Sequence, residues 1–327
     1  MATSTHQIQE TKDDLELRFK DDSNLWDQLR KVLSELRWTA NDIASMSLLS
    51  EMDNVEIVFL VRKSDNKLVG SLVSVEMQTF TFCGMYYAHK DYRAHGIGHK
   101  IAGTYIKRNG ALLAKQPFIY RSVPMMTAKY TKEYEGYSFY HVFDCEFPSR
   151  TAVLDFFPNS QPEMSGHIVP IKDLSHRQFR EFCEYDKFVT NSDRTNFLQN
   201  YYSIDFVKGV VLYNSLGKII GCAAIAPTTT EEALYKIGPV YAGNQADACR
   251  LVHEVVSLPK EQDARFVFLC REQSAGDWIL EKGKKHGVKM HEAGALGCTG
   301  VFGPVYKDQS RPENIHIGQC SPCYFDI

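Results

Sequence analysis

A short sequence in the first half of the chain returns in the second half, and this repeat limits the folds that the chain can adopt. Lys67-Leu68-Val69-Gly70 recurs as Lys218-Ile219-Ile220-Gly221, an offset of 218 − 67 = 151 residues. In both copies the motif opens an apolar run of the kind that forms β-strands. Repetition at the length of a domain indicates two copies of one fold, and 327 residues are enough for two domains with their own cores.

The predicted elements follow the same order in both halves. In the first half we expect strands at 15–19, 55–61, 68–77, 79–88, 118–123, 137–147 and 151–157, with helices at 24–37, 41–49, from 97 onward and at 126–135. In the second half a strand at 168–171, a helix that begins with the capping box Ser175/Gln178, a helix at 195–202 and strands at 207–213 and 218–226 repeat the opening of that order. The pattern predicts an α+β fold in which each domain has a mostly antiparallel, twisted mixed sheet flanked by helices.

Proline and polar residues suggest the domain boundaries. The run Pro158-Asn159-Ser160-Gln161-Pro162 is the best candidate for a linker. We therefore expect a flexible N-terminus at 1–13, a first domain at 14–157, a linker at 158–165 and a second domain at 166–327.

Composition excludes several classes of protein. The chain is 44% hydrophobic and 24% charged with a net charge of −3, which argues against a disordered chain and against a nucleic-acid partner. It has no apolar run of about 18 residues and no apolar N-terminal signal, so we expect a cytoplasmic protein without a membrane partner. Cys320-Ser321-Pro322-Cys323 with His316 is half of a zinc or redox site, but no second pair has ligand spacing, and we expect no metal.

A glycine-containing turn after a predicted strand is the main candidate for a binding site. The stretch from Tyr86 to His99 reads as a strand end, a tight turn and the first turn of a helix. Free N–H groups at a helix N-terminus bind anions, and glycines let a phosphate approach the backbone. A pair of glycines alone is also ordinary turn chemistry, so the spacing by itself leaves both interpretations open.

The sequence Arg93-Ala94-His95-Gly96-Ile97-Gly98 resembles the pyrophosphate loop of the GNAT superfamily of acyl-CoA-dependent N-acyltransferases. A dinucleotide-binding fold fits less well, because its glycine-rich turn follows the first strand of a domain. The resemblance implies acetyl-CoA as co-substrate. The implied contacts to it are Tyr86, Tyr87, Ala88, Arg93, Ala94, His95, Gly96, Ile97, Gly98 and His99.

The second half departs from this pattern. The offset of 151 carries Gly96 to Asp247 and Gly98 to Cys249, so neither glycine is kept, and a carboxylate at Asp247 would repel phosphates. Residues 14–327 resemble tandem-GNAT proteins in layout, and the second domain is expected to lack CoA binding.

The resemblance also implies the chemistry, which is direct transfer of an acetyl group to a primary amine. The family pattern after Ala128 puts Lys132 where a tyrosine is usual, so Tyr134, or else Tyr130, is the candidate general acid. Glu76 is the candidate base, with His89 and a water relay as alternatives.

The sequence leaves the function and partners open at several points. We expect an N-acetyltransferase with a small-molecule amine as acceptor, and the alternative is a non-catalytic acyl-CoA binder whose second domain binds a partner. A homodimer is compatible with the sequence. Because clefts between domains are common binding sites, the second domain should contribute to the acceptor site, and a fragment ending near Ser160 should bind CoA but acetylate poorly.

Overall fold

The computed structural model describes residues 14–20, 22–38, 42–93, 95–123, 126–127, 138–158, 166–299, 304 and 308–319. The first half contains β1 (Leu15–Arg18), α2 (Ser23–Glu35), α3 (Ile43–Leu49), β2 (Val55–Arg62), β3 (Lys67–Glu76), β4 (Thr81–Ala88), η1 (Lys90–Tyr92), α4 (Ile97–Leu113), β5 (Phe118–Ser122), β6 (Ser138–Phe147) and α6 (Arg150–Phe156). The second half contains β7 (His167–Pro170), η2 (Ile171–Asp173), α7 (His176–Thr190), α8 (Thr195–Ser203), β8 (Lys208–Tyr213), β9 (Ile219–Pro227), β10 (Leu234–Ala242), α9 (Gln245–Val256), β11 (Arg265–Arg271), α10 (Asp277–His286), β12 (Lys289–Thr299), η3 (Pro312–Asn314) and β13 (Ile315–Ile317).

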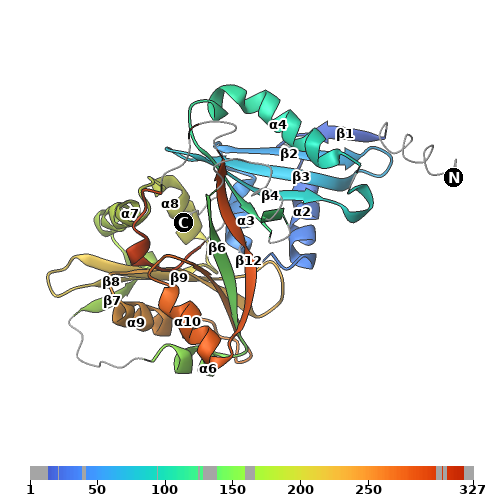
Figure 1. The fold of residues 1–327 in the computed structure, drawn as a ribbon. Coiled ribbons are helices and arrows are strands. Elements are labelled where there is room, and N and C mark those ends of the chain that lie inside the picture. Colours follow the sequence, from blue (N-terminus) through green and yellow to red (C-terminus); the bar gives the residue numbers. More distant parts are fainter. Residues whose placement is uncertain are drawn as a thin grey trace.

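The strands of both halves join in one mixed sheet (Figure 1). Its order is β1-β2-β3-β4-β5-β12-β6-β11-β10-β9-β8-β7, and β13 pairs with β10 outside this path. Only the β4–β5 and β10–β11 pairs are parallel among the pairs described. The predicted α+β class with mostly antiparallel sheets is confirmed. No helix in the described ranges combines the length and apolar composition needed to cross a lipid bilayer.

The two halves exchange strands at the centre of this sheet. β12 lies between β5 and β6, with Ala295 opposite both Ser122 and His141. β6 in turn pairs with β11, where Cys145 lies opposite Phe268. Each half therefore completes the sheet of the other, and residues 138–147 pack beside strands of the second half.

The segment 151–157, predicted as a strand, is a helix instead. The Ser149 side chain accepts a hydrogen bond from the backbone N–H of Ala152 at 3.2 Å and caps α6. Val153, Phe156 and Phe157 then fall at helical spacing and enter the core of the second half. The short apolar run fits both periods, and the serine cap and tertiary packing select the helix.

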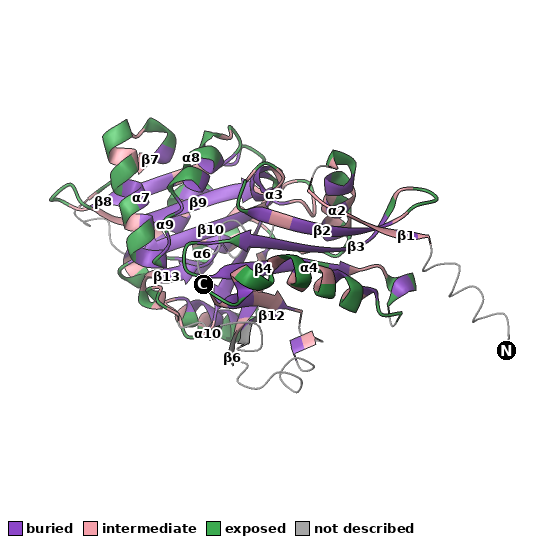
Figure 2. Cartoon of the chain, turned by 90° about the horizontal axis from the view of Figure 1, so that it is seen from above, coloured by how far each residue is buried: buried purple, intermediate pink, exposed green. Residues whose placement is uncertain are grey.

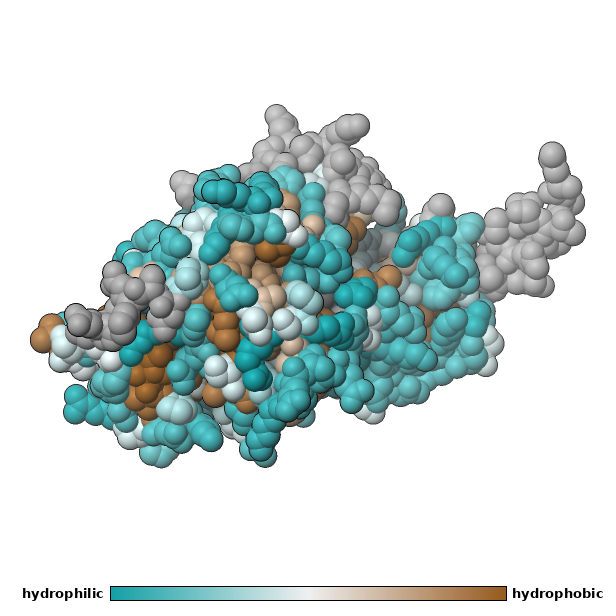
Figure 3. Space-filling model, turned by 90° about the horizontal axis from the view of Figure 1, so that it is seen from below, coloured by the Kyte–Doolittle hydropathy of each residue, from teal (hydrophilic) through white to brown (hydrophobic). Residues whose placement is uncertain are grey.

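Among the described residues, three clusters of buried side chains hold the fold together. Figure 2 shows that the strands of the sheet are mostly buried and that the helices have exposed outer surfaces. The largest cluster joins α2 and α3 to α7 and α8 across both halves, and includes Trp26 and Tyr201. On the other face, α4 packs over the first half through Ile101 and Tyr105, while α9 and α10 cover the second half in a separate cluster. Seen from below (Figure 3), apolar patches are separated by hydrophilic side chains. One face of the sheet thus has a common core, and the other has one core per half.

Candidate active site

The predicted phosphate loop leads into a helix whose N-terminus lacks a side-chain cap. Gly96 is the N-cap residue of α4, with a left-handed φ of 77°, and as a glycine it provides no side-chain cap to the first turn. The N–H groups of that turn have no acceptor within the helix. Gly98 lies under the hydroxyl of Tyr86, because a Cβ at position 98 would be 2.5 Å from that oxygen. The first turn of α4 can therefore donate to an anion with no capping side chain in competition.

The strand that precedes the loop contains a β-bulge. In the β3–β4 pairing, Ser71 lies opposite Tyr87 and Val73 lies opposite Gly84, so two residues of β4 face the single residue between them. Met85 has a φ of 51°, and the buried Ser71 hydroxyl donates to its carbonyl at 2.8 Å. A bulge leaves backbone groups outside the ladder. The sequence marked this place only through Gly84, and the role of Ser71 carried no sequence signal.

The sheet opens between β4 and β5 next to this bulge. The two strands pair only from Thr81/Phe118 to Cys83/Tyr120. From Gly84 on, β4 has no strand neighbour on that side within the described ranges. We call this unpaired stretch of β4 the β4–β5 gap. It includes the bulge and leads along the chain, through η1, to the first turn of α4, so its backbone groups could pair with an extended ligand whose anionic end reaches that turn.

The corresponding gap in the second half is closed. β10 and β11 pair in parallel only from Leu234/Arg265 to Ile237/Phe268, and β13 then pairs with the far end of β10. An isolated bridge joins Leu269 of β11 to Gly318, directly after β13. A strand of the chain itself thus occupies the place that stays open in the first half.

The N-terminus of α9 is also occupied. The Asn244 side chain accepts from the backbone N–H of Asp247 at 2.9 Å and donates to the Asp247 carboxylate at 2.7 Å. Asp247 is buried at this first turn. The carboxylate that the sequence placed near a phosphate is therefore part of the helix cap.

The residues expected to bind the co-substrate have the following positions. Arg93 is exposed, and its Nε donates to the Ala88 carbonyl at 3.0 Å. His95 and His99 are exposed beside the loop, and Ile97 is buried beneath it. Tyr86 is 38% exposed, while burial raises the pKa of Tyr87. Ala94 lies outside the described residues.

The catalytic candidates are distributed differently. Tyr130 and Tyr134 lie outside the described residues. Glu76 is exposed at the end of β3, opposite Thr81, so about 13 Å of β4 separate its position from the bulge at Met85. His89 caps η1 and lies 3.5 Å from Asp91, and burial lowers its pKa. The structure does not bring Glu76 to the gap.

Within the described ranges, no group of three or more metal-ligating side chains is present. His316 is buried beside Trp278, whose Nε1–H donates to His316 Nδ1 at 3.1 Å. Cys320 and Cys323 lie outside the described residues.

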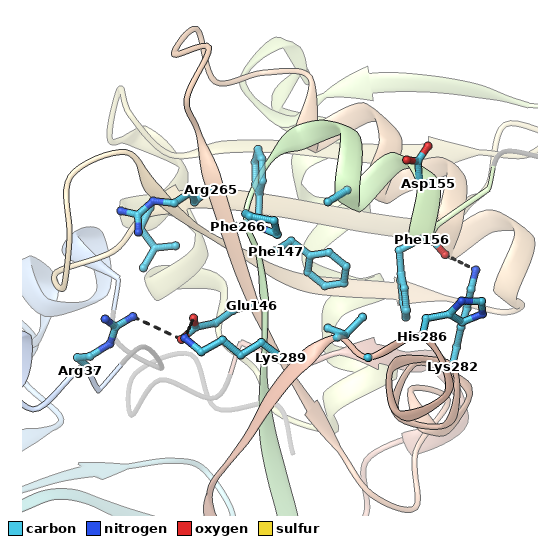
Figure 4. Close-up of a pocket in the computed structure, with 15 residues that line it drawn as sticks. Arg37, Glu146, Phe147, Asp155, Phe156, Arg265, Phe266, Lys282, His286 and Lys289 are labelled. Carbon is cyan, nitrogen blue, oxygen red and sulfur yellow. Dashed lines mark hydrogen bonds and ion pairs between the residues drawn. The ribbon is translucent and has the colours of Figure 1, made fainter.

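A second concave surface lies between β6, β12, α6 and α10 (Figure 4). Its volume is about 870 Å³, and Phe147, Phe156 and Phe266 form its apolar wall. Arg37 bridges Glu146 at 3.4 Å and Glu231 at 2.5 Å across its edge. It begins where β10 and β11 begin, at Leu234 and Arg265, so it lies at the opposite end of these strands from the closed gap.

Comparison with known proteins finds a family match in the second half of the chain. Residues 182–291 match the family described as "Acetyltransferase (GNAT) domain". The protein "Uncharacterized protein F36G3.2" of Caenorhabditis elegans is 26% identical over 310 residues, which span 93% of this chain and 95% of that protein.

Solved structures show the same arrangement at low sequence identity. A tandem GNAT protein from the clavulanic acid biosynthesis pathway superposes with a TM-score of 0.62 at 12% identity, covering 87% of this chain and 98% of that one. Saccharomyces cerevisiae N-myristoyltransferase with bound myristoyl-CoA superposes with a TM-score of 0.51 at 10% identity, covering 91% and 84%. Proteins of the GNAT family are acyltransferases that use acyl-CoA, so the fold supports acyl transfer. The chain has the tandem GNAT fold, with a GNAT acetyltransferase domain recognised in the sequence of its second half.

Proposed function

We propose that this protein transfers an acetyl group from acetyl-CoA to the primary amine of a small molecule by direct transfer. The observation that carries the proposal is the open β4–β5 gap beside the uncapped N-terminus of α4. The gap fits an extended thioester, and the free N–H groups of α4 fit a pyrophosphate. The absence of a comparable opening between β10 and β11 supports a site in the first half alone.

Backbone groups and one arginine side chain would bind acetyl-CoA. Backbone donors at Gly96–His99 and the exposed Arg93 would hold the phosphates. Backbone groups of Tyr86–Ala88 would pair with the pantetheine arm, and N–H groups at the bulge would polarise the acyl carbonyl.

A thioester supplies an activated acyl group. As the C–N bond forms and the C–S bond breaks, the amine loses a proton and the departing sulfur gains one. Tyr134, with Tyr130 as alternative, is our candidate donor to the sulfur. Because Glu76 lies far from the bulge along β4, a water relay to solvent is the better candidate for deprotonating the amine.

Replacing Gly96 by aspartate tests the phosphate site. Gly96→Asp puts a carboxylate at the helix N-terminus and a side chain at a φ of 77°, so acetyl-CoA affinity should fall by about 100-fold or more. Gly103→Asp is the matched control, because it adds the same charge to α4 at a position where a Cβ would meet no described atom within 4 Å apart from its chain neighbours and the helix's own backbone. Calorimetry gives the affinities, and release of free CoA with a panel of amines gives the activity.

The result separates the proposal from its alternative. Acetyl-CoA binding that depends on Gly96, together with amine-dependent CoA release, supports the transferase. Binding without CoA release for any amine would favour a non-catalytic acyl-CoA binder. Equal affinity in the Gly96→Asp variant and the wild type would contradict the assigned site.

A further inference from the structure

A buried arginine at the end of β11 has hydrogen-bond donors without acceptors. Arg271 is 3% exposed, and its Nη2 donates to Asp308 Oδ2 at 2.7 Å. The guanidinium group lies over the Tyr140 ring at 4.1 Å. Its Nε and Nη1 are buried and have no hydrogen-bond partner among the residues that the structure describes. An unsatisfied buried donor costs free energy, the more so when charged, and therefore requires an explanation.

Arg194 is another buried arginine, and it shows how the N–H donors of an arginine with a structural role are paired in this fold. Arg194 is 4% exposed, and its Nε and Nη2 donate to the two oxygens of Asp186 at 3.0 and 2.5 Å. Its Nη2 also reaches the Tyr241 hydroxyl at 3.3 Å. Arg194 thus donates from both the Nε and the Nη2 of its guanidinium group, whereas the guanidinium group of Arg271 donates a single hydrogen bond, to Asp308, among the described residues.

Arg271 lies on the same face of the central sheet as Arg121, and Arg121 lies at the edge of the β4–β5 gap. Arg121 of β5 and Tyr140 of β6 both lie opposite position 296 of β12, so they form a row across three strands. With strands about 4.8 Å apart, this row spans about 10 Å. Arg121 is the first residue of β5 beyond its pairing with β4, and its Nη1 is also buried without a hydrogen-bond partner within the described ranges. Among the described residues, arginine N–H groups without acceptors therefore lie both at the edge of the gap, on Arg121, and at Arg271.

The row lies on the face that points away from α4. Ile119, two residues before Arg121, and Leu269, two residues before Arg271, belong to the core shared by both halves. The helix α4, with the candidate phosphate site, packs on the opposite face through Ile101 and Tyr105. A molecule at Arg271 would thus reach the gap from the side opposite acetyl-CoA.

Carboxylates lie on the same face as these arginines. Asp308 accepts a hydrogen bond from Arg271, and Asp144, opposite Leu269, lies further along the face. Lys236, which is buried, and Glu146, both opposite Val267, lie beyond it. Carboxylates on the same face as arginine N–H donors without acceptors favour a ligand that carries both a carboxylate and an amine over a dianion such as a phosphate ester.

We propose that Arg271, with Arg121, binds the carboxylate of an amino acid acceptor whose amine reaches the β4–β5 gap. This inference rests on the proposed function and names its substrate class. Arg271 comes from the second half and the gap from the first, so the acceptor site spans both.

The test uses the full-length protein, acetyl-CoA and pairs of acceptors that differ only in the acid group. The acceptors are ω-amino acids from glycine to 6-aminohexanoate, each compared with its amide. We expect KM for the best acid to be at least 10-fold below that of its amide, with an optimum of chain length.

Arg271→Lys keeps a charge for Asp308 but removes donors, so it should raise KM for the acid about 10-fold and leave KM for acetyl-CoA and the amide unchanged. Arg265→Lys is the control on the same strand, at the end away from the gap.

Direct binding separates this inference from the proposed function. Calorimetry with 6-aminohexanoate and its amide requires no turnover. Binding of acids that depends on Arg271, without acyl transfer, would support the inference and overturn the proposed function. Transfer to acids and amides with equal KM, or an acid KM that Arg271→Lys does not change, would overturn the inference and leave the proposed function standing.

Discussion

Single residues explain why the repeated motif ends in glycine. A Cβ at Gly70 would lie 2.5 Å from Ile101 of α4, and a Cβ at Gly221 would lie 2.8 Å from Leu251 of α9. Each would also lie within 3.0 Å of a backbone oxygen of the neighbouring strand, at Tyr87 and Tyr241. The glycine therefore lets a helix pack closely on the sheet in both halves. The repeat marks a packing constraint, which is why it persists where the phosphate loop does not.

The buried His316 makes folding sensitive to acid. Burial lowers the pKa of His316 from its usual value of 6.5 to about 4, and its Nδ1 accepts a hydrogen bond from Trp278. Between these values the unfolded chain binds a proton that the folded chain does not. This group therefore leaves stability unaffected above about pH 6.5 and lowers it as the pH falls toward 4, by up to about 3 kcal/mol.

The variant His316→Asn tests this contribution, because an amide oxygen can still accept from Trp278. Urea unfolding at pH 7.5 and pH 5 should show a smaller loss of the free energy of unfolding in the variant than in the wild type. The same loss in both proteins would show that His316 does not carry the acid sensitivity.

At the scale of elements, α4 and α9 occupy equivalent positions in the two halves, but their N-termini differ. α4 begins at a glycine without a side-chain cap, while α9 begins at Asn244 with Asp247 in its first turn. The adjoining gap is open beside α4 and contains β13 in the second half. Because the second half lacks both features that would admit acyl-CoA, we expect it not to bind acyl-CoA in the same way.

We therefore expect one acetyl-CoA site per chain. Calorimetry should give a stoichiometry near one, and Asp247→Ala should change the affinity by less than about 2-fold, since its carboxylate only completes the α9 cap. A stoichiometry of two, or a strong effect of Asp247→Ala, would contradict the assignment of the site to the first half.

At the scale of the whole molecule, strand exchange makes the two halves interdependent. β6 has β12 and β11 as its neighbours, and the largest core contains side chains from α2 as well as α8. This arrangement argues against the expectation that a fragment ending near residue 160 binds acetyl-CoA by itself. In that fragment, β5 and β6 would lose the strand between them and expose unpaired edges.

A fragment of residues 14–160 should therefore fail to unfold cooperatively and should aggregate. If the full chain is instead cut at a protease site placed between residues 158 and 166, the two pieces should stay together, because their strands interleave. Size-exclusion chromatography and thermal unfolding by circular dichroism measure both outcomes. A monomeric, cooperatively folded 14–160 fragment would disprove the interdependence.

The sequence by itself determined the features that depend on nearby residues. Alternating apolar runs placed β2 and β3, helical spacing placed α2, and the capping box at Ser175 and Gln178 forms as predicted. The turn before α4 was predictable because its glycines and the helix start are adjacent in the chain. The fold class followed from these local patterns and from the repeat.

Only the tertiary structure decided which strands are neighbours. The alternation in β6 is the same whether it pairs with β5 or with β12, because pairing partners leave no mark in a single strand. The same holds for β13, which closes the second gap, and for Arg271, whose unfilled donors follow from burial between strands of both halves. These contacts join residues far apart in the chain, such as His141 with Ala295 and Val240 with Ile317, so they arise from packing and not from local sequence.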